Sequence, residues 1–325
     1  MSVAARPPLV ATLILNWNDS EATRRCVESA VMTAYPNQRL YVFDNGASAR
    51  TRAELAGLAA SATMLESPTN LGYTGGNNAA IRRAIADGAD FVWLLNNDAV
   101  VTPDVLPSLV GLATSDPRLG IVSPLICQEE NPEIYQFAGA IKDFHHGLFI
   151  DTIDREVGRD WQARLADRFL IFGTAMLIRR TLIERIGELD DRLFAYHEDI
   201  DYSLRSLAAG FANRIDFASR VLHRSKPPVP APHVYYLMTR NELLVWNKHG
   251  KGSWLRSRLY AANRVAGLLE RLREHGPQLD AALAGLWDGL RGVWGPYDPQ
   301  RRMPRRLADA LKAHPAFVRR VFRLI

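Results

Sequence analysis

Short apolar runs alternate with longer amphipathic stretches through the first third of the chain. Four apolar runs begin at Leu9, Leu40, Thr63 and Phe91, and each is too short to form a helix. Between them, apolar residues recur at helical spacing, as at Val27, Ala30 and Val31. Such alternation is typical of right-handed βαβ units. It predicts an α/β fold with a Rossmann-like, mainly parallel sheet flanked by helices.

Polar residues follow three of these strands directly, at residues 16–18, 44–46 and 96–98. In an open α/β sheet the carboxyl ends of parallel strands share one edge, and ligands bind there. The stretch FVWLLNNDAVV ends its strand at Asn-Asn-Asp, and a carboxylate flanked by amides can hold a hard cation and its phosphates. An ordinary turn before a helix capped by Thr102 and Pro103 is the alternative interpretation.

The second half of the chain has a weaker pattern. Residues 127–165 show no clear period, and residues 169–180 form an apolar segment broken at Gly173 and Thr174. A helix then begins near Glu198 with three acidic residues in its first turn. These acids either favour the helix dipole or, beside His197, supply a general base.

A short strand over residues 217–223 ends in His223, which is either a structural residue or a partner of Asp98 in a metal shell. Prolines between residues 226 and 232 then predict a linker.

The remainder of the chain looks helical and basic. Helices are expected from His233 onward and over residues 254–273 and 279–294, and Arg240 either contacts phosphate or is a surface charge. An Arg-rich piece, residues 301–325, predicts either a packed C-terminal helix or an interfacial helix on an anionic bilayer.

Composition narrows the functional classes. The net charge of +5 hides a basic C-terminal region, because residues 251–325 hold 15 Lys and Arg against 6 Asp and Glu. This excess suits an anionic membrane surface or a phosphorylated acceptor. Because no zinc-finger or RRM motif is present, we expect no nucleic-acid partner. The first strand lacks GxGxxG, which disfavours an NAD dehydrogenase.

Cysteine usage and hydropathy predict the compartment. Cys26 and Cys127 have no CxxC or Cys/His spacing, so reduced, packed thiols are expected. The sequence has no run of eighteen apolar residues and no secretory signal. We therefore expect a cytoplasmic protein that is either free or peripheral at the inner face of the plasma membrane, and either a monomer or a homo-oligomer.

These residues carry a family resemblance over roughly residues 9–247. In order, its landmarks are LILNWN, the DNG after the second strand, NLGYTGGNN, LLNND, FGTAMLIRR, HEDIDYSLR and YYLMTRN. The chain resembles the inverting family 2 glycosyltransferases of the GT-A fold, particularly rhamnosyltransferase-like members. The resemblance implies a GT-A domain over residues 1–247, with a nucleotide-binding half to about 125 and an acceptor half from about 126. A basic helical region follows at 248–325.

The resemblance also implies a ligand set. The donor would be a nucleoside-diphosphate sugar (a dTDP- or UDP-sugar), with Mg²⁺ or Mn²⁺ as cofactor. Asp98 and His223 would hold the metal, Asp199 would be the catalytic base, and Glu198 would orient it or contact the acceptor. The implied donor-binding residues are Asn16, Asn18, Asp44, Gly75, Asn77, Asn96, Asn97, Gly173 and Arg240. The GGNN segment at residues 75–78 either adds backbone N–H donors or is a glycine-rich turn.

The sequence departs from the common DXD pattern, because Asn96 replaces the first Asp. This removes one charge, although hard cations also accept amide oxygens. The hypothesis is a metal-dependent inverting glycosyltransferase that moves rhamnose from dTDP-rhamnose to a bacterial glycan or lipid-linked acceptor. The alternative is a non-catalytic module that binds a nucleotide sugar or glycan and has a degenerate metal motif.

Overall fold

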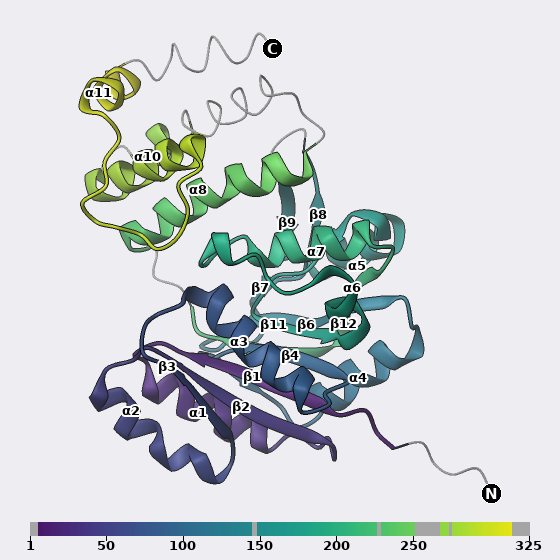
Figure 1. Cartoon of the computed structure of the whole chain (residues 1–325). Helices are drawn as coiled ribbons and strands as arrows, with labels where there is room; N and C mark the ends of the chain where they lie inside the picture. The colour runs from purple at the N-terminus through teal and green to yellow at the C-terminus, as the bar shows by residue number, and fades with distance from the viewer. Residues whose placement is uncertain (1–5, 145–147, 226–228, 251–266, 273–274, 314–325) are drawn as a thin grey trace, which may run out of the picture. The chain divides into compact units, whose positions relative to one another are not determined.

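The computed structural model describes residues 6–144, 148–225, 229–250, 267–272 and 275–313 (Figure 1). The chain divides into two compact units. The first comprises residues 1–142, 149–190 and 198–225, and the second comprises residues 143–148, 191–197 and 226–325.

The first unit is built on a nine-stranded sheet. Its strands are β1 (Val10–Asn16), β2 (Gln38–Asn45), β3 (Thr63–Ser67), β4 (Phe91–Asn96), β5 (Ala99–Val101), β6 (Leu119–Gln128), β7 (Tyr135–Phe137), β11 (Ala175–Arg179) and β12 (Ala212–His223). The order is β3-β2-β1-β4-β11-β6-β12-β5, with β7 paired to β6. Strands β3, β2, β1 and β4 pair in parallel, as do β6 and β12, whereas β11, β5 and β7 run antiparallel to their neighbours. The predicted mainly parallel sheet is confirmed.

Helices flank this sheet (Figure 1). They are α1 (Ser20–Val31), α2 (Ala49–Leu55), α3 (Gly72–Ala86), α4 (Val105–Ser115), α5 (Arg155–Arg164), α6 (Arg180–Ile186) and α7 (Glu198–Ala208), with 3-10 turns at Ala56–Ala60 and Ala166–Arg168. A second, three-stranded sheet has the order β10-β8-β9, formed by β10 (Phe169–Leu170), β8 (Gly139–Lys142) and β9 (Phe149–Thr152). The region without a clear sequence period thus contains short strands and α5.

Local sequence signals explain most element boundaries. Asp19 caps α1 by accepting from Ala22 N at 3.1 Å, and Ser48 caps α2 by accepting from Thr51 N at 3.2 Å. The central strands β1 and β4 are apolar along nearly their whole length because helices cover them, and Trp93 is fully buried. The free thiols of Cys26 and Cys127 are both buried, as predicted.

The second unit is helical, with a 3-10 turn at Asp191–Leu193 and helices α8 (Pro232–His249), α10 (Gly276–Arg291) and α11 (Arg305–Ala313). Helices α8 and α10 approach closely, since a Cβ at Gly285 would lie 2.2 Å from Tyr236 O. Because α8 packs on α10, the two units divide near residue 225, whereas the sequence predicts a domain boundary at 247.

Parts of the predicted C-terminal helices, at residues 254–266, 273 and 314–325, lie outside the described residues. Among the described helices, none combines the length and the hydropathy needed to cross a membrane.

One helix begins earlier than the sequence suggests. The glycines near residue 75 predict a loop with a helix starting at residue 78, but α3 starts at Gly72. The reason is packing: a Cβ at Gly76 would lie 2.5 Å from Leu15 Cδ1 and 3.3 Å from the Asn45 side chain. Glycine is therefore required inside this helix so that α3 can approach β1 and β2 closely.

This close approach can be tested with Gly76→Ala. We expect the substitution to lower the free energy of unfolding by about 1–3 kcal/mol, because the added methyl group forces Leu15 to move. Chemical denaturation measures the change. Gly111→Ala is the matched control, since Gly111 also lies within a helix but a Cβ there meets nothing within 4 Å. That control should raise stability by up to about 1 kcal/mol. Equal effects of the two substitutions would contradict the packing explanation.

Candidate active site

Strand register brings polar residues to one edge of the main sheet. Asn16 pairs with Asp44 across β1 and β2, and Leu15 pairs with Asn96 across β1 and β4. Strand β12 ends at His223, which pairs with Ala99 of β5. Asn16, Asp44, Asn96 and His223 are therefore at the ends of strands that run in the same direction, and the predicted convergence on one sheet edge is observed.

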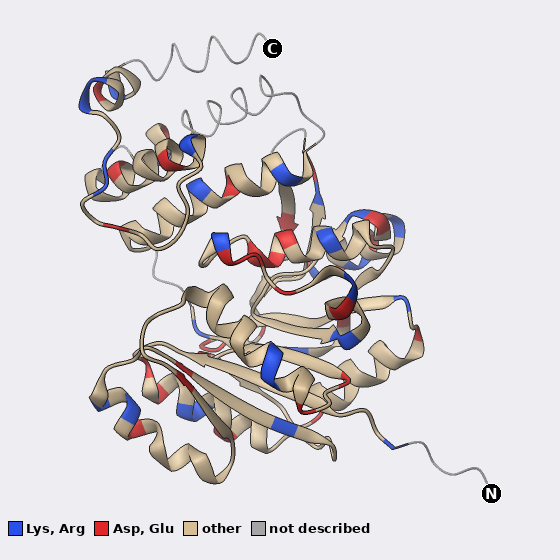
Figure 2. Cartoon of the chain, viewed as in Figure 1, with Lys and Arg blue, Asp and Glu red and all other residues tan. Residues whose placement is uncertain are grey.

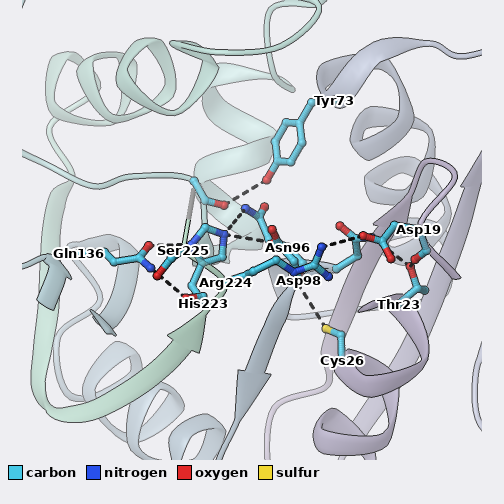
Figure 3. Close-up of polar contacts among 12 residues, drawn as sticks. Asp19, Thr23, Cys26, Tyr73, Asn96, Asp98, Gln136, His223, Arg224 and Ser225 are labelled. Atoms are coloured by element: carbon cyan, nitrogen blue, oxygen red, sulfur yellow. Dashed lines mark hydrogen bonds and ion pairs between the residues drawn. The ribbon is translucent and has the colours of Figure 1, made fainter. Parts of the chain in front are cut away.

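An acid–imidazole pair forms the centre of this edge. Asp98 Oδ1 lies 3.1 Å from His223 Nε2, although the two residues are far apart in sequence (Figure 3). Gln136 of β7 orients the ring: its Oε1 lies 2.8 Å from His223 Nδ1, and its Nε2 donates to His223 O at 2.8 Å. Gln136 thus fixes the orientation of the ring, with Nε2 directed at Asp98.

Side chains of α1 hold the turn between β4 and β5 in place. Asn97 Nδ2 donates to Thr23 Oγ1 at 3.1 Å, and Thr23 Oγ1 donates to Asn16 Oδ1 at 2.9 Å. Cys26 Sγ donates to Asn96 O at 3.3 Å (Figure 3). Asn96 Nδ2 lies 3.5 Å from His223 Nε2. Among residues 96–98, Asn97 thus faces α1, whereas Asn96 and Asp98 approach the imidazole.

Charge around Asp98 favours its ionised form. Burial by itself raises the pKa of the Asp98 carboxyl, but the hydrogen bond and charge of His223, with the charge of Arg224, outweigh burial and lower that pKa overall. Arg224 Nη1 in turn donates to Asp19 Oδ2 at 3.0 Å, and its backbone N–H donates to Asp98 O at 3.2 Å (Figure 3). A cationic side chain is therefore held next to the acid–imidazole pair.

The acidic first turn of α7 contributes a second carboxylate (Figure 2). Asp199 Oδ2 accepts from Gly173 N at 2.8 Å, and Tyr73 OH donates to Gly173 O at 3.0 Å. Desolvation, followed by the charges of Glu198, Asp199 and Asp98, raises the pKa of Tyr73 well above its ordinary value. The Tyr73 hydroxyl therefore lies close enough to Asp98 and to the acids of α7 for their charges to affect its pKa. The backbone N–H of Gly173 holds the Asp199 carboxylate.

Two of the predicted donor-binding residues already have protein partners. Asp44 is 3% exposed, and its carboxylate accepts from Arg52 Nε at 2.7 Å and from Ala47 N at 2.9 Å. Asn18 adopts a left-handed backbone with φ of 56°, and its Oδ1 accepts from Ser48 N at 2.8 Å. Both residues shape the loop after β2.

The GGNN segment does not form a loop. Gly75 lies within α3, and Asn77 is buried with its Nδ2 donating to Tyr73 O at 2.9 Å inside the same helix. Asn77 thus stabilises the first turns of α3, and the backbone N–H of Gly72, at the start of this helix, donates to Asn70 Oδ1 at 2.8 Å.

Arg240 requires a correction. Its side chain has no exposed surface, and its guanidinium donates to Asn241 Oδ1 and to the carbonyls of Gly295 and Leu193, all within the second unit. Burial lowers the pKa of Arg240. A buried guanidinium with its donors directed at backbone carbonyls is not available to a diffusible phosphate, so the assignment of Arg240 to donor binding is wrong for this conformation.

A divalent cation fits the chemistry of the Asp98–His223 pair. One carboxylate oxygen, one imidazole nitrogen with a fixed tautomer partner and the nearby Asn96 amide form a mixed O/N donor set that Mn²⁺ or Mg²⁺ accepts. Within the described part of the chain, no three His, Cys, Asp or Glu side chains cluster closely enough to bind a metal by themselves. The remaining ligands would have to come from solvent or from a bound diphosphate.

Gln136 and Arg224 at this edge belong to none of the sequence motifs, and Tyr73 lies in NLGYTGGNN without a role assigned to it. Gln136 and Arg224 act through contacts with His223 and Asp98, and Tyr73 through Gly173. Trp17 directly follows β1 and is 53% exposed, which is unusual for a large aromatic side chain. Its position between Asn16 and Asn18 was the one signal available for it in the sequence.

The buried amide of Asn16 has a donor without an acceptor. Its Oδ1 accepts from Thr23 Oγ1 and Asp19 N, whereas its Nδ2 has no hydrogen-bond partner within the residues described. An unsatisfied buried donor is costly, and binding of an acceptor group there would remove that cost.

Comparison with known sequences gives a family match. The model of a family described as "Glycosyltransferase like family 2" matches residues 7–243. Galactofuranosyltransferase GlfT1 of Mycolicibacterium smegmatis is 25% identical over 221 residues, which cover 66% of this chain and 70% of GlfT1. GlfT1 of Mycobacterium tuberculosis is 26% identical over 206 residues, 62% of this chain and 64% of that protein. The N-acetylglucosaminyl-diphospho-decaprenol L-rhamnosyltransferase of M. tuberculosis is 24% identical, covering 59% of this chain and 69% of the relative.

Solved structures support the same fold. The mannosyltransferase PcManGT from Pyrobaculum calidifontis, in complex with GDP-Man and Mn²⁺, aligns with a TM-score of 0.57 at 14% identity over 97% of this chain and 86% of its own. S. aureus TarS aligns with a TM-score of 0.55 at 12% identity, over 96% of this chain and 52% of its own. The predicted GT-A type of α/β fold is confirmed.

The burial of Cys26 and Cys127 predicts how slowly their thiols react. Desolvation raises the pKa of Cys26 and of Cys127, so the thiolate is scarce even in mildly alkaline solution. We expect neither thiol of the native chain to react with a disulfide reagent within minutes at about pH 8, and both to react in denaturant. Absorbance of the released chromophore measures the labelling. Fast labelling of Cys26 in the native protein would show that the turn around Asn96 is open.

Proposed function

The chain belongs to the "Glycosyltransferase like family 2" and is a glycosyltransferase that uses a nucleotide sugar, and from this premise we propose that it is a metal-dependent inverting enzyme. The observation that carries the proposal is the 3.1 Å contact between Asp98 and His223, oriented by Gln136 at the carboxyl edge of the parallel strands. Such a pair next to a separate carboxylate, Asp199, provides the two functions that the reaction needs.

Asp98 and His223 would hold Mg²⁺ or Mn²⁺, with Asn96 close enough to contribute its amide. The cation would neutralise the charge that develops on the leaving diphosphate. This assignment is supported by the mixed donor set and by Mn²⁺ in the complex of PcManGT. Because Asn96 stands where the common pattern has an aspartate, the site has one negative charge fewer to attract the metal. The positive side chain of Arg224 beside Asp98 would add to the attraction of the diphosphate.

Asp199 would act as the general base. Gly173 N–H holds one of its oxygens, which leaves the carboxylate oriented but half-buried. In a single displacement, an acceptor hydroxyl oxygen bonds to the anomeric carbon while the bond from that carbon to the diphosphate oxygen breaks. The electron pair of the broken bond leaves with the diphosphate, and Asp199 takes the hydroxyl proton. Attack opposite to the leaving group inverts the anomeric centre.

The nucleoside would bind between the ends of β1 and β2. Trp17 offers an exposed face for stacking a base, and the free Nδ2 of Asn16 offers a buried donor. Asp44 would contact the ribose or base while its carboxylate still accepts the hydrogen bond from Arg52. The first 125 residues would thus serve the donor, and residues 126–247 the acceptor.

For the sugar we propose rhamnose from dTDP-rhamnose, passed to a bacterial glycan or lipid-linked acceptor. The similarity to the N-acetylglucosaminyl-diphospho-decaprenol L-rhamnosyltransferase of M. tuberculosis supports this choice, whereas the similarity to the galactofuranosyltransferase GlfT1 makes galactofuranose the competing sugar. In the basic C-terminal region, α11 has no buried residue and exposes Leu307 beside Arg305 and Arg306. These residues support a peripheral position on an anionic membrane; residues 314–325 lie outside the described part.

The metal assignment predicts that turnover depends on a divalent cation. With dTDP-rhamnose or UDP-galactofuranose as donor, nucleotide release should cease in EDTA and return with Mn²⁺ or Mg²⁺. Gln136→Leu should raise the concentration of Mn²⁺ that gives half-maximal activity by about 10- to 100-fold, because the imidazole loses its orienting partner. Gln162→Leu, which removes a glutamine that binds Ile215 instead, should leave that concentration unchanged. Full activity of Asp98→Ala in the presence of EDTA would refute the assignment.

The assignment of the base predicts a separate effect. Asp199→Asn should bind the donor normally but lower kcat by about 10²–10⁴-fold, because no group then accepts the acceptor proton. Binding is measured by calorimetry and turnover by release of the nucleoside diphosphate. Near-normal turnover by this variant would place the base elsewhere, and donor binding by the wild type without turnover on any acceptor would favour a binding module.

A further inference from the structure

The Arg240-Asn241 pair of α8 makes several hydrogen bonds to the backbone of residues 193–196. Asn241 Nδ2 lies 2.8 Å from Leu193 O, 2.7 Å from Ala195 O and 2.8 Å from Tyr196 O. Arg240 Nη2 donates to Leu193 O at 3.0 Å, and Arg240 Nε donates to Asn241 Oδ1 at 2.9 Å. The last bond fixes the amide so that its N–H groups face the carbonyls. Both residues have no exposed surface.

The bound segment, residues 193–197, has an unusual backbone. Phe194, Tyr196 and His197 all have positive φ, of 63°, 70° and 67°, and none of them is glycine. A side chain in this region clashes with its own backbone, so such residues are rare, and three of them among four consecutive residues need strong support from surrounding contacts. The hydrogen bonds from Asn241 to the carbonyls of Leu193, Ala195 and Tyr196 provide such support.

The segment ends where the proposed base begins. His197 is followed by Glu198, the first residue of α7, and Asp199 is the second. The backbone direction at residue 197 therefore sets where α7 starts. In the first unit, Asp199 Oδ2 accepts from Gly173 N, and that amide reports on the position of the carboxylate.

We propose that Arg240 and Asn241 are positioning residues: they hold residues 193–197 in the backbone conformation, left-handed at Phe194, Tyr196 and His197, from which α7 starts, and thereby fix the Asp199 carboxylate for proton transfer. The inference rests on the proposed function for its catalytic part. It gives the YYLMTRN motif a role in the reaction through the backbone, in place of direct contact with the donor.

Asn241→Asp tests this role in the full chain. The change keeps the shape of the side chain but replaces the N–H donors with an oxygen that repels three carbonyls. We expect amide exchange at Gly173 to become about tenfold faster and kcat with dTDP-rhamnose or UDP-galactofuranose to fall about 10²-fold, with the donor KM unchanged. The control is Asp288→Asn, which alters another buried polar residue of the same unit, one that binds Tyr236 and Arg301. It should change neither quantity.

A matched pair at one position covers the case in which Asn241→Asp does not fold. Tyr196→Gly and Tyr196→Ala both remove the ring, but only glycine adopts a φ of 70° without penalty. We expect Tyr196→Gly to retain a kcat about fivefold higher than Tyr196→Ala.

The outcomes separate the two proposals. Absence of turnover by the wild type with either donor would count against the proposed donor, while the exchange of Gly173 would still test the positioning role. If the wild type is active and Asn241→Asp resembles Asp288→Asn in kcat and in exchange at Gly173, the positioning role is refuted. A kcat of Tyr196→Ala equal to or above that of Tyr196→Gly would refute it as well.

Discussion

Hydrogen bonds between parallel strands determine which residues end level with one another, and in this chain that register creates the site. β1, β2 and β4 run in one direction and end at Asn16, Asn45 and Asn96, with Asp44 next to the end of β2. β12 ends at the same edge with His223, because β6 and β12 continue the parallel arrangement beyond the antiparallel β11. Polar residues that are costly to bury inside a sheet are tolerated at its edge, where ligands can satisfy them.

The chemistry of this edge depends on restraint of each group by a neighbour. Gln136 fixes the imidazole of His223, Thr23 holds Asn97, and Gly173 holds Asp199. A general base and a metal ligand are useful only in one orientation, and fixed neighbours remove the entropy of finding it. With Asn96 in place of a second acid, Asp98 is the carboxylate of residues 96–98, and the positive charge of Arg224 beside it favours its ionised form.

Close packing and local strain are found where the backbone has to be placed accurately. Gly76 lets α3 approach β1, and Gly285 lets α8 approach α10. The three left-handed residues before α7 have the opposite character, because they keep side chains in a conformation that suits glycine. Such strain persists only where other contacts determine the backbone, here the amide of Asn241.

The sequence by itself determined the alternating strands and helices, the polar ends of β1, β2 and β4, and through its motifs the family. These are short-range signals, because periodicity and capping act within a few residues. It did not reveal Gln136 or Arg224, whose importance comes from contacts with residues distant in the chain. It also misplaced the start of α3 and the role of Arg240. Whether a glycine-rich stretch is helical, or an arginine is buried, depends on what packs against it, and only the tertiary structure decides that.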